Sequence, residues 1–432
     1  MHQASSRKDF KAKPAVSGLM LVKDVSLMQS GSLVKGRDIL IHNDRITKIG
    51  RDLKDEESEV IDGHGMLAIP GLINCHTHLA MTLFRGYADD MALMPWLQEK
   101  IWPLEAKLTR DDIIWGVKLG CLELIRFGIC CYNDMYYLTD DTAVATKEMG
   151  LRAYLSGVIF DMRPELLKAV EPFIRRWKGD PLIHPVIGPH AIYTCSEETL
   201  LSARDLAEKY DVMLHTHLSE TKGEVESSLK EHGKSPVEYL DSLGFLGKKT
   251  VAAHCVWLSE KDISILAHRE VNVAHCPVSN LKLAAGIAPV GSLMAAGVNV
   301  CLGTDGASSN NNLNLFEEMK TTAIVQKNSC GKPDALKAED AWRMATDNAC
   351  RAFGLDIGLR EGALADLALI DLRRPWFKPE TSMVSHLIYS NPGTVDTTIV
   401  NGRVLMLHGV IPGEEEIMEN AQKRFERLTE GL

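Results

Sequence analysis

The sequence predicts a (β/α)8 TIM-type barrel together with a small β-sandwich domain that is built from both ends of the chain. Short apolar runs alternate with helical patterns through the middle of the chain, β-type patterns flank that region, and 432 residues suffice for a barrel and a smaller companion. The expected divisions are a disordered extension at 1–17, the β-domain at 18–68 and 359–412, the barrel at 69–358, and a C-terminal helix at 413–432.

Both ends of the chain carry the patterns of short strands, which alternate in hydropathy or are rich in β-branched residues. The expected strands are 19–25, 38–42 and 46–49 near the start, and 364–371, 395–401 and 403–410 near the end. Because the same texture returns after the barrel region, we expect the two ends to meet in one small domain. Residues 414–428 have the charged, amphipathic pattern of a final helix.

The middle of the chain alternates regularly between strand candidates and helix candidates. The expected strands are 67–76, 130–134, 153–158, 185–189, 212–218, 250–254, 271–275 and 298–304. The clearest helical patterns are 109–127, 197–209, 236–243 and 259–269. Such a βα alternation favours a parallel barrel, in which the carboxyl ends of all strands meet at one face.

The composition is that of an ordinary soluble globular protein, with 45% apolar and 25% charged residues. The net charge of −10 argues against nucleic-acid polymers and anionic membranes as partners, although a single nucleoside needs no basic surface. The ten cysteines include no CxxC pair and are expected to be reduced thiols. Residues 1–17 lack the apolar core of a secretory signal, and no apolar run reaches membrane-spanning length. We therefore expect a cytoplasmic protein.

Candidate metal ligands fall at the ends of several predicted strands. His76 and His78 are two residues apart, so they project from one side of their strand. His217 closes a later apolar run, and Asp305 follows the last run of the barrel region. Each residue alone has a simpler explanation, such as an Asp-Gly turn for Asp305. Their joint placement at one barrel face predicts a site for a divalent cation.

Other polar residues at the same strand ends suggest acid–base chemistry. Glu220 follows His217 by three residues and is suited to shuttling protons beside a metal. His254 could bind the metal or stabilise the attacking water or the developing charge, whereas His275 is expected to be more structural. His215 could also face inward, but it lies deeper in its apolar run and ranks below His217. Two metals would need a carbamylated lysine to bridge them at the end of the 185–189 run. No lysine closes that run, so one metal is expected.

This set of groups predicts hydrolysis by metal-activated water. A divalent cation lowers the pKa of bound water from ~16 towards ~7. Asp305 would accept a proton from that water, and Glu220 would protonate a ring nitrogen of the substrate. The neighbouring carbon would then be attacked, and an amino group would leave as ammonia.

Several motifs resemble the amidohydrolase superfamily over most of residues 19–412. They are Pro70–His78, His215–Glu220, Ala253–His254 and Gly303–Gly306. Finer motifs are similar to the 5′-methylthioadenosine/S-adenosylhomocysteine deaminase group. They are Met94–Leu97, Trp102–Glu105, Gly188–Cys195 and His275–Asn280.

The resemblance implies one zinc ion, or iron, held by His76, His78, His217 and Asp305. It implies Glu220 as the proton shuttle and His254 beside the metal-bound hydroxide. The residues that it implies for substrate binding are Glu105 on the ribose hydroxyls, His190 on the substrate, Trp96 and Ser309 in the pocket wall, and Arg152 and Arg163 towards the substrate tail. Taken alone, Glu105 could be a surface carboxylate, Trp96 a core residue and His190 a satisfied loop histidine. Such barrels often self-associate, so a homo-oligomer is expected.

The expected function is deamination of the adenine ring of adenosine-type nucleosides to the inosine analogue and ammonia. Candidate substrates are 5′-methylthioadenosine, S-adenosylhomocysteine, 5′-deoxyadenosine and adenosine. The alternatives are a triazine-type chlorohydrolase, a guanine- or pterin-type deaminase, or a metal-free scaffold without activity. Glu105 and His190 together favour a nucleoside, and the presence of all four ligands disfavours the scaffold.

Overall fold

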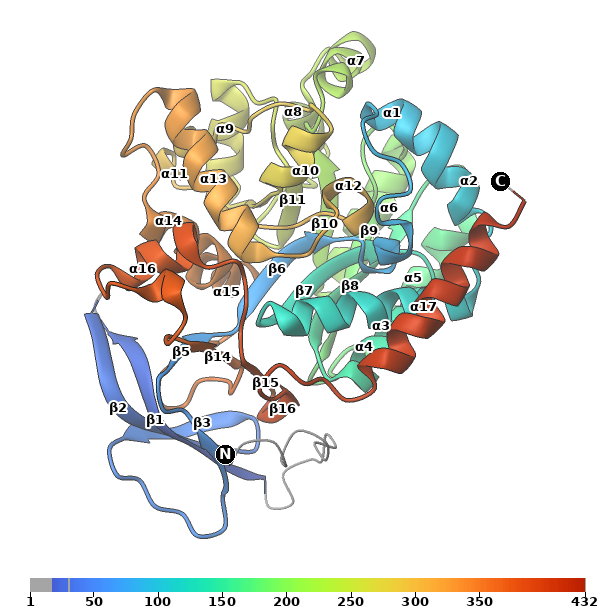
Figure 1. Ribbon diagram of the computed structural model, residues 1–432. Helices are drawn as coiled ribbons and strands as arrows, with labels where there is room; N and C mark the ends of the chain where they lie inside the picture. Colours follow the sequence, from blue (N-terminus) through green and yellow to red (C-terminus); the bar gives the residue numbers. More distant parts are fainter. Residues whose placement is uncertain (1–17, 30–31, 432) are drawn as a thin grey trace.

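The computed structural model describes residues 18–29 and 32–431, so the expected extension at 1–17 lies outside the described residues. It contains a parallel eight-stranded barrel and a mixed sheet made from both ends of the chain (Figure 1). Both parts of the predicted fold class are therefore confirmed. Within the described ranges, no helix is long and apolar enough to cross a bilayer.

Each barrel strand pairs in parallel with its neighbours in chain order. The strands are β6 (Leu72–Thr77), β7 (Ile129–Tyr136), β8 (Arg152–Ile159), β9 (Ile183–Pro189), β10 (Met213–Leu218), β11 (Thr250–His254), β12 (Asn272–His275) and β13 (Asn299–Leu302). The barrel closes where the backbone N–H groups of Thr304 and Asp305 donate to the carbonyl of His76, at 3.1 and 3.0 Å. Gly303 permits this approach, because a Cβ there would lie 2.8 Å from the Cβ of His76.

Helices surround the barrel, and most begin at capping residues visible in the sequence. Ser196 caps α6 through the N–H of Thr199, and Ser259 with Asp262 forms a capping box on α9. The longer helices are α3 (Arg110–Arg126), α4 (Thr139–Met149), α5 (Pro164–Trp177), α6 (Glu197–Tyr210), α7 (Lys222–His232), α8 (Pro236–Ser242), α9 (Glu260–His268), α13 (Leu315–Cys330), α14 (Ala338–Ala345) and α15 (Asp347–Phe353). The shorter ones are η1 (Leu79–Phe84), α1 (Leu93–Trp96), η2 (Leu97–Ile101), α2 (Trp102–Glu105), α10 (Pro277–Lys282), α11 (Val290–Ala295), α12 (Ala307–Asn310), η3 (Pro375–Phe377), α16 (Met383–Ser385) and η4 (His386–Ser390).

The predicted strand at 67–76 is two strands that belong to different sheets. β5 (Met66–Pro70) joins the mixed sheet, and β6 begins the barrel after Gly71. The single apolar run hid this division, because both halves are buried. Pro70 has no N–H to continue the sheet ladder. The N–H of Gly71 donates instead to the backbone carbonyl of Asp366, at 2.9 Å.

The mixed sheet has the order β16-β15-β14-β5-β1-β2-β3, with β4 paired to β1. Its other strands are β1 (Leu19–Gln29), β2 (Ser32–His42), β3 (Arg45–Gly50), β4 (Glu59–Asp62), β14 (Leu367–Asp371), β15 (Thr397–Val400) and β16 (Arg403–Met406). It encloses its own apolar cluster, which includes Val22, Ile39 and Leu367. Strand β4 was not predicted, because only Ile61 of its four residues is buried and the segment has no apolar alternation.

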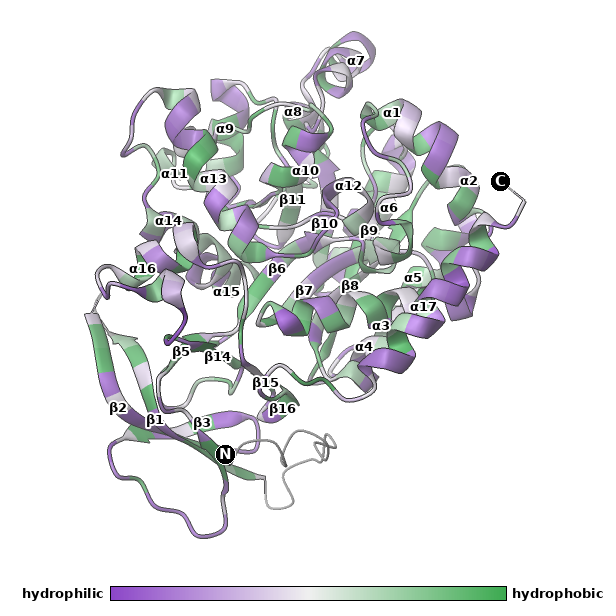
Figure 2. Ribbon diagram, in the orientation of Figure 1, coloured by the Kyte–Doolittle hydropathy of each residue, from purple (hydrophilic) through white to green (hydrophobic). Residues whose placement is uncertain are grey.

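The C-terminal helix α17 (Glu414–Thr429) lies along α3 on the outside of the barrel (Figure 1). Figure 2 shows that its surface is mostly hydrophilic, as the charged sequence pattern predicts. Ion pairs fix both of its ends, since Arg126 of α3 pairs with Glu414 and Arg427 pairs with the buried Asp112. The end of the chain therefore braces the barrel wall between β6 and β7.

Candidate active site

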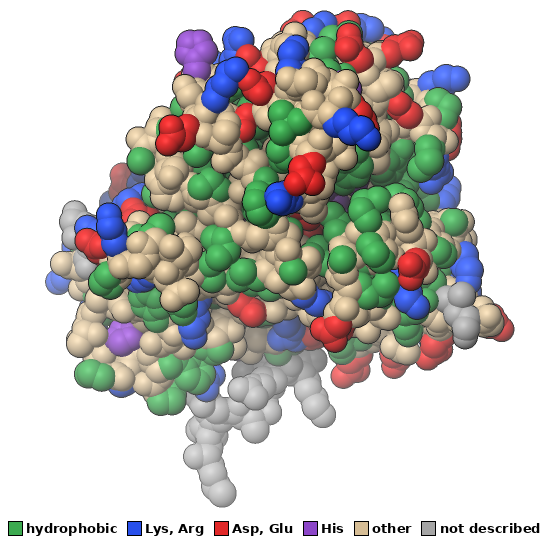
Figure 3. Space-filling view, turned by 90° about the horizontal axis from the view of Figure 1, so that it is seen from above, with side chains coloured by type: hydrophobic (Ala, Val, Ile, Leu, Met, Phe, Trp, Pro, Cys, Tyr) green, Lys and Arg blue, Asp and Glu red, His purple; other side chains and the backbone are tan. Residues whose placement is uncertain are grey.

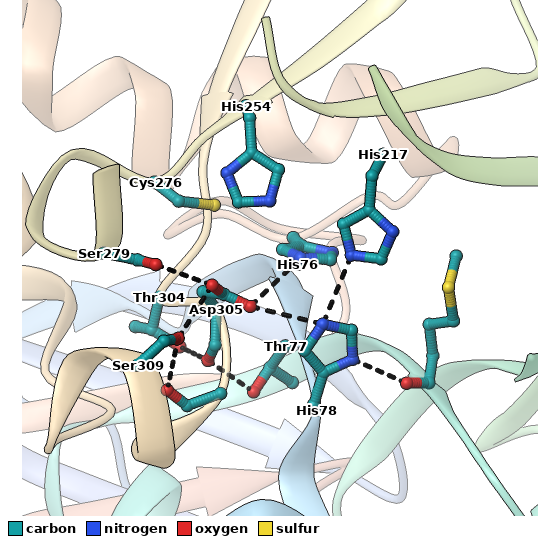
Figure 4. Close-up of polar contacts among 12 residues, drawn as sticks. His76, Thr77, His78, His217, His254, Cys276, Ser279, Thr304, Asp305 and Ser309 are labelled. Atoms are coloured by element: carbon teal, nitrogen blue, oxygen red, sulfur yellow. Dashed lines mark hydrogen bonds and ion pairs between the residues drawn. The ribbon is translucent and has the colours of Figure 1, made fainter. Parts of the chain in front are cut away.

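Three imidazoles and a carboxylate converge at the carboxyl ends of the barrel strands (Figure 4). His76 and His78 come from β6, His217 from β10, and Asp305 follows β13. Oδ1 of Asp305 lies 3.4 Å from Nε2 of His76 and 3.2 Å from Nε2 of His78. Nε2 of His217 lies 3.3 Å from Nε2 of His78. The structure thus brings together the four predicted ligands.

The spacing and chemistry of these atoms fit a divalent cation. Tetrahedral zinc ligands at ~2.0–2.2 Å from the ion lie about 3.3–3.6 Å from one another, close to the separations seen here. Nε2 of His76 is buried and makes no hydrogen bond within the described residues. An unpartnered imidazole nitrogen beside a carboxylate is the arrangement expected of a ligand set. His254 lies within the same cluster, with its ligating atom within 4.8 Å of those of His76 and His217.

Hydrogen bonds to the other ring nitrogen hold each ligand imidazole in place. Nδ1 of His78 donates to the carbonyl of Met135 at 2.6 Å, and Nδ1 of His217 donates to the carbonyl of His190 at 2.9 Å. Nδ1 of His76 lies 2.8 Å from Nε2 of His215. Such bonds fix the tautomer in which Nε2 keeps a lone pair for a metal.

His215 was ranked below His217 from the sequence, and the structure gives it a specific place. It is fully buried beneath His76, and its own Nδ1 lies 3.3 Å from Oγ of Ser156. That hydroxyl donates in turn to the carbonyl of Asp134, at 2.6 Å. His215 lies two residues before His217 on β10, further from the mouth of the barrel. It therefore contacts Nδ1 of His76 and does not lie among the four proposed ligands.

We expect His215→Phe to weaken metal binding about 10–100-fold, because His76 would lose the acceptor that fixes its tautomer. Titration with a competing chelator measures this affinity. His232→Phe is the matched control, because His232 stacks on Tyr239 away from the strand ends. Equal affinities for the His215 variant and the unaltered protein would contradict the assignment.

Burial and neighbouring charges set the protonation of the cluster. Burial lowers the pKa of His76 to about 4 and that of His217 well below its usual value. Burial also opposes charge on His78, but the hydrogen bond and charge attraction to Asp305, the bond to the carbonyl of Met135 and the charge of Asp134 together outweigh burial and raise the pKa to about 9. Burial raises the pKa of Asp305, yet its close approach to the imidazoles of His76 and His78 and their charge attraction hold it well below its usual range. Metal binding would therefore displace a proton from His78.

Two serine hydroxyls orient the carboxylate of Asp305. Oγ of Ser279 and Oγ of Ser309 donate to Oδ2, at 2.7 and 2.8 Å, and leave Oδ1 towards the imidazoles (Figure 4). Ser309 also lines the cavity, as the resemblance implies. Ser279 lies within the motif His275–Asn280 but was given no role from the sequence, because its contact with Asp305 depends on how the α10 helix packs.

Glu220 lies in the same cavity and faces His254. Its Oε2 is 3.8 Å from Nε2 of His254, whose Nδ1 donates to Oδ1 of Asn280 at 2.8 Å. Burial raises the pKa of the Glu220 carboxyl, which favours the protonated form. Glu224 fixes the loop, since its carboxylate accepts the backbone N–H groups of Ser219 and Glu220, both at 2.8 Å.

Three residues of the site adopt the left-handed backbone conformation. Ser219, His254 and Asp305 have φ values of 52°, 73° and 61°. Such conformations are costly for residues other than glycine and often occur at functional sites. They turn the chain sharply at the ends of β10 and β11 and after β13. That turn is how the backbone brings these side chains into the barrel mouth.

A cavity of about 630 Å³ opens above the cluster. Figure 3 looks into this face, where apolar side chains surround a central hollow. The predicted substrate residues Glu105, His190, Trp96 and Ser309 all line the cavity. It also has walls that the sequence did not identify, chiefly the aromatic residues Tyr136, Tyr137, Phe160 and Tyr193. These follow or end barrel strands, but aromatic residues there carry no distinctive sequence signal.

The two arginines that were expected at the substrate tail separate in the structure. Arg163 lines a neighbouring hollow of about 550 Å³. Glu105 and Tyr137 line both this hollow and the main cavity. Arg152 starts β8, at the opposite end of the barrel, where its Nε donates to Oδ2 of the buried Asp366 at 3.1 Å. The expectation for Arg152 is therefore corrected: it joins the barrel to the mixed sheet and does not face the cavity.

His275 has the more structural position that the sequence suggested. It is almost fully buried at the end of β12 and does not line the cavity. Its carbonyl accepts the N–H of Gly303 at 2.9 Å, which helps to hold the chain just before Asp305.

Comparison with known proteins identifies the family. Residues 67–405 match the amidohydrolase family. This chain belongs to the amidohydrolase family. A similar member is a 5′-deoxyadenosine deaminase of Methanothrix thermoacetophila, 64% identical over 95% of this chain and 99% of the relative. Another is 5-methylthioadenosine/S-adenosylhomocysteine deaminase 1 of Archaeoglobus fulgidus, 45% identical over 95% of this chain and 99% of the relative.

A solved structure has the same architecture. The crystal structure of an adenosine deaminase from Xanthomonas campestris, with bound zinc, aligns with a TM-score of 0.90 and 32% identity. The alignment covers 95% of this chain and 98% of that chain. Both the barrel and the mixed sheet are thus within the range of known amidohydrolase folds.

Proposed function

We propose that this amidohydrolase deaminates the adenine ring of adenosine analogues, such as 5′-deoxyadenosine, 5′-methylthioadenosine and S-adenosylhomocysteine. The observation that carries the proposal is one cavity that joins a His3Asp cluster to Glu220 at its base and Glu105 at its wall. The names of the similar relatives, all deaminases of such nucleosides, support the substrate class.

One divalent cation would be held by His76, His78, His217 and Asp305. We propose zinc, because imidazole and carboxylate ligands suit it and a related structure binds it; iron accepts the same ligands. The cation would supply water activated for attack at neutral pH.

The protein groups supply the proton transfers and the orientation. Asp305 accepts the proton of the attacking water, and His254, aligned by Asn280, faces that water and the developing charge. Glu220 gives a proton to N1 of the ring, so C6 becomes more electrophilic. After water adds at C6, Asp305 passes the proton that it accepted to the amino group, which leaves as ammonia. Glu220 takes back a proton from the hydroxyl at C6, so the 6-oxo ring of the inosine analogue remains.

Substrate contacts are assigned along the cavity, from the cluster outwards. His190 is kept neutral, because burial lowers its pKa to about 3, and it lies beside the base position. Glu105 accepts hydrogen bonds from the ribose hydroxyls, which a carboxylate can do for two vicinal groups at once. Trp96 forms part of the apolar wall, and its Nε1 is already used by the carbonyl of Ala88 at 3.0 Å. Arg163 lies in the hollow beyond Glu105, where a 5′ substituent would extend.

The assembly and location of the enzyme remain proposals as well. We propose a homo-oligomer, as the family resemblance suggests, and a cytoplasmic location. Its acidic charge of −10 fits a small-molecule substrate rather than a nucleic-acid polymer.

We expect Glu105→Ala to raise KM for nucleosides ~10-fold or more and to leave the metal content unchanged, because it removes charge-assisted hydrogen bonds at the ribose. Steady-state kinetics and metal analysis of one preparation test this. Glu99→Ala is the matched control, because Glu99 is exposed in the preceding turn. Equal KM values for Glu105→Ala and the unaltered enzyme would show that the ribose is not held there.

An ammonia-release screen with metal analysis tests the function as a whole. The substrates are the adenosine analogues named above, with guanine, a pterin and a chlorotriazine as the arms for other amidohydrolase reactions. We expect ammonia from the nucleosides and about one metal per chain. Protein that carries no metal after growth with ample zinc, and is indifferent to chelators, would overturn the proposal.

A further inference from the structure

The carboxylate of Glu105 is held by two tyrosines at the end of β7. The hydroxyl of Tyr136 donates to Oε1 of Glu105 at 2.8 Å, and the hydroxyl of Tyr137 lies 3.5 Å from Oε2. A bond of 2.8 Å to a carboxylate is a good charge-assisted hydrogen bond, whereas 3.5 Å is at the outer limit. Tyr136 therefore makes the stronger of the two contacts.

Glu105 depends on this contact, because its own segment is not part of the barrel. It ends α2, which with α1 and η2 forms a short helical segment beside the mouth of the barrel (Figure 1). Burial raises the pKa of the Glu105 carboxyl, and the bond from Tyr136 opposes that rise. The hydroxyl of Tyr136 thus ties the carboxylate to a barrel strand and favours its charged form.

The preceding residue on β7 serves the cation site. The carbonyl of Met135 accepts Nδ1 of His78, and Tyr136 is its immediate neighbour in the chain. Consecutive residues of one buried strand therefore fix a ligand of the cation and the proposed ribose acceptor. The separation of the cation site from the proposed ribose acceptor is therefore set by adjacent residues of one strand.

We propose that Tyr136 is a positioning residue that aligns Glu105 and so determines the preference of the enzyme for substrates with a ribose diol. The inference rests on the proposed function. A carboxylate oxygen that accepts one bond from Tyr136 retains lone pairs for a sugar hydroxyl, so both can be bound together. Without the tyrosine hydroxyl, Glu105 would lose its partner and its fixed orientation.

The test compares adenosine with 2′,3′-dideoxyadenosine, which has no hydroxyl for Glu105 to accept. We expect Tyr136→Phe to lower kcat/KM for adenosine ~10-fold, mainly through KM, and to change that for the dideoxy analogue less than ~2-fold. Tyr137→Phe removes only the longer contact, so its effect on the adenosine to dideoxyadenosine ratio should be under ~3-fold. The metal content should stay the same in all three proteins.

Two results would overturn the inference. An unchanged ratio in Tyr136→Phe, whether both rates fall equally or neither falls, would mean that the tyrosine only supports the packing. A larger change of the ratio in Tyr137→Phe would assign the role to that residue instead. Failure of the proposed function would look different, because the unaltered enzyme would then release no ammonia from either nucleoside.

Discussion

Glu220→Gln is expected to lower kcat for adenosine analogues ~100-fold or more while the metal content stays at one per chain. The glutamine side chain has nearly the same size, but its amide cannot give a proton to the ring and take it back. The side-chain contact that the structure describes for Glu220 is with His254, at 3.8 Å from Oε2 to Nε2, so an amide of the same size should leave the four proposed ligands in place. The measurements are the rate of ammonia release and the metal content of the same protein.

The control for Glu220 lies on the next helix. Glu226 is an exposed carboxylate of α7 that pairs with Lys222 at 3.4 Å, so Glu226→Gln changes the charge equally without touching the cavity. We expect its rate to match that of the unaltered enzyme. A near-normal rate for Glu220→Gln would remove Glu220 from the proton transfer.

Arg152→Met is expected to reduce the free energy of unfolding by ~3–5 kcal/mol, because it leaves the carboxylate of Asp366 buried without its partner. The two side chains are 4% and 0% exposed, and Nη1 of Arg152 also donates to the carbonyl of Pro181 at 2.6 Å. Asp366 further accepts the backbone N–H of Asn401 at 2.6 Å. Equilibrium unfolding in urea, followed by tryptophan fluorescence, measures the loss.

An exposed ion pair of the same kind provides the comparison. Arg175 pairs with Glu171 on the surface of α5 at 2.7 Å, and Arg175→Met should cost less than ~1 kcal/mol. The double variant Arg152→Met with Asp366→Leu should recover part of the lost stability, because no charge is then left unpaired. Equal unfolding midpoints for Arg152→Met and Arg175→Met would show that the buried pair has no special role.

The architecture, and the meeting of the four residues that we propose as ligands, were accessible from the sequence for a physical reason. Parallel strands of a barrel are buried on both faces, so they are continuous apolar runs that helices separate. Functional side chains must lie where such a run ends, and His78, His217 and Asp305 stand there. The division of the run at Pro70 was missed, because burial is equally complete on both sides of it.

The supporting residues could not be recognised in the same way. Ser279 and Glu224 lie in helices, and their role depends on which loop each helix packs against. Tyr136 ends a fully buried strand, where an aromatic residue is expected for packing alone. Arg152 could have been placed from the sequence. It begins a barrel strand, and the amino ends of the strands lie at the face opposite the active site. Chain direction alone would have placed it correctly.

The closure of the barrel, between β6 and the chain after β13, has a consequence for the order of folding and metal binding. The carbonyl of His76 on the first strand receives the N–H groups of Thr304 and Asp305, which follow the last strand. A chain emerging from the ribosome has both β6 histidines early, but their carboxylate partner comes some 230 positions later. All four proposed ligands could therefore bind a cation together only after the barrel has closed. Because the cation would bind only the closed barrel, its binding would stabilise the closed state, and only fully folded molecules would carry it.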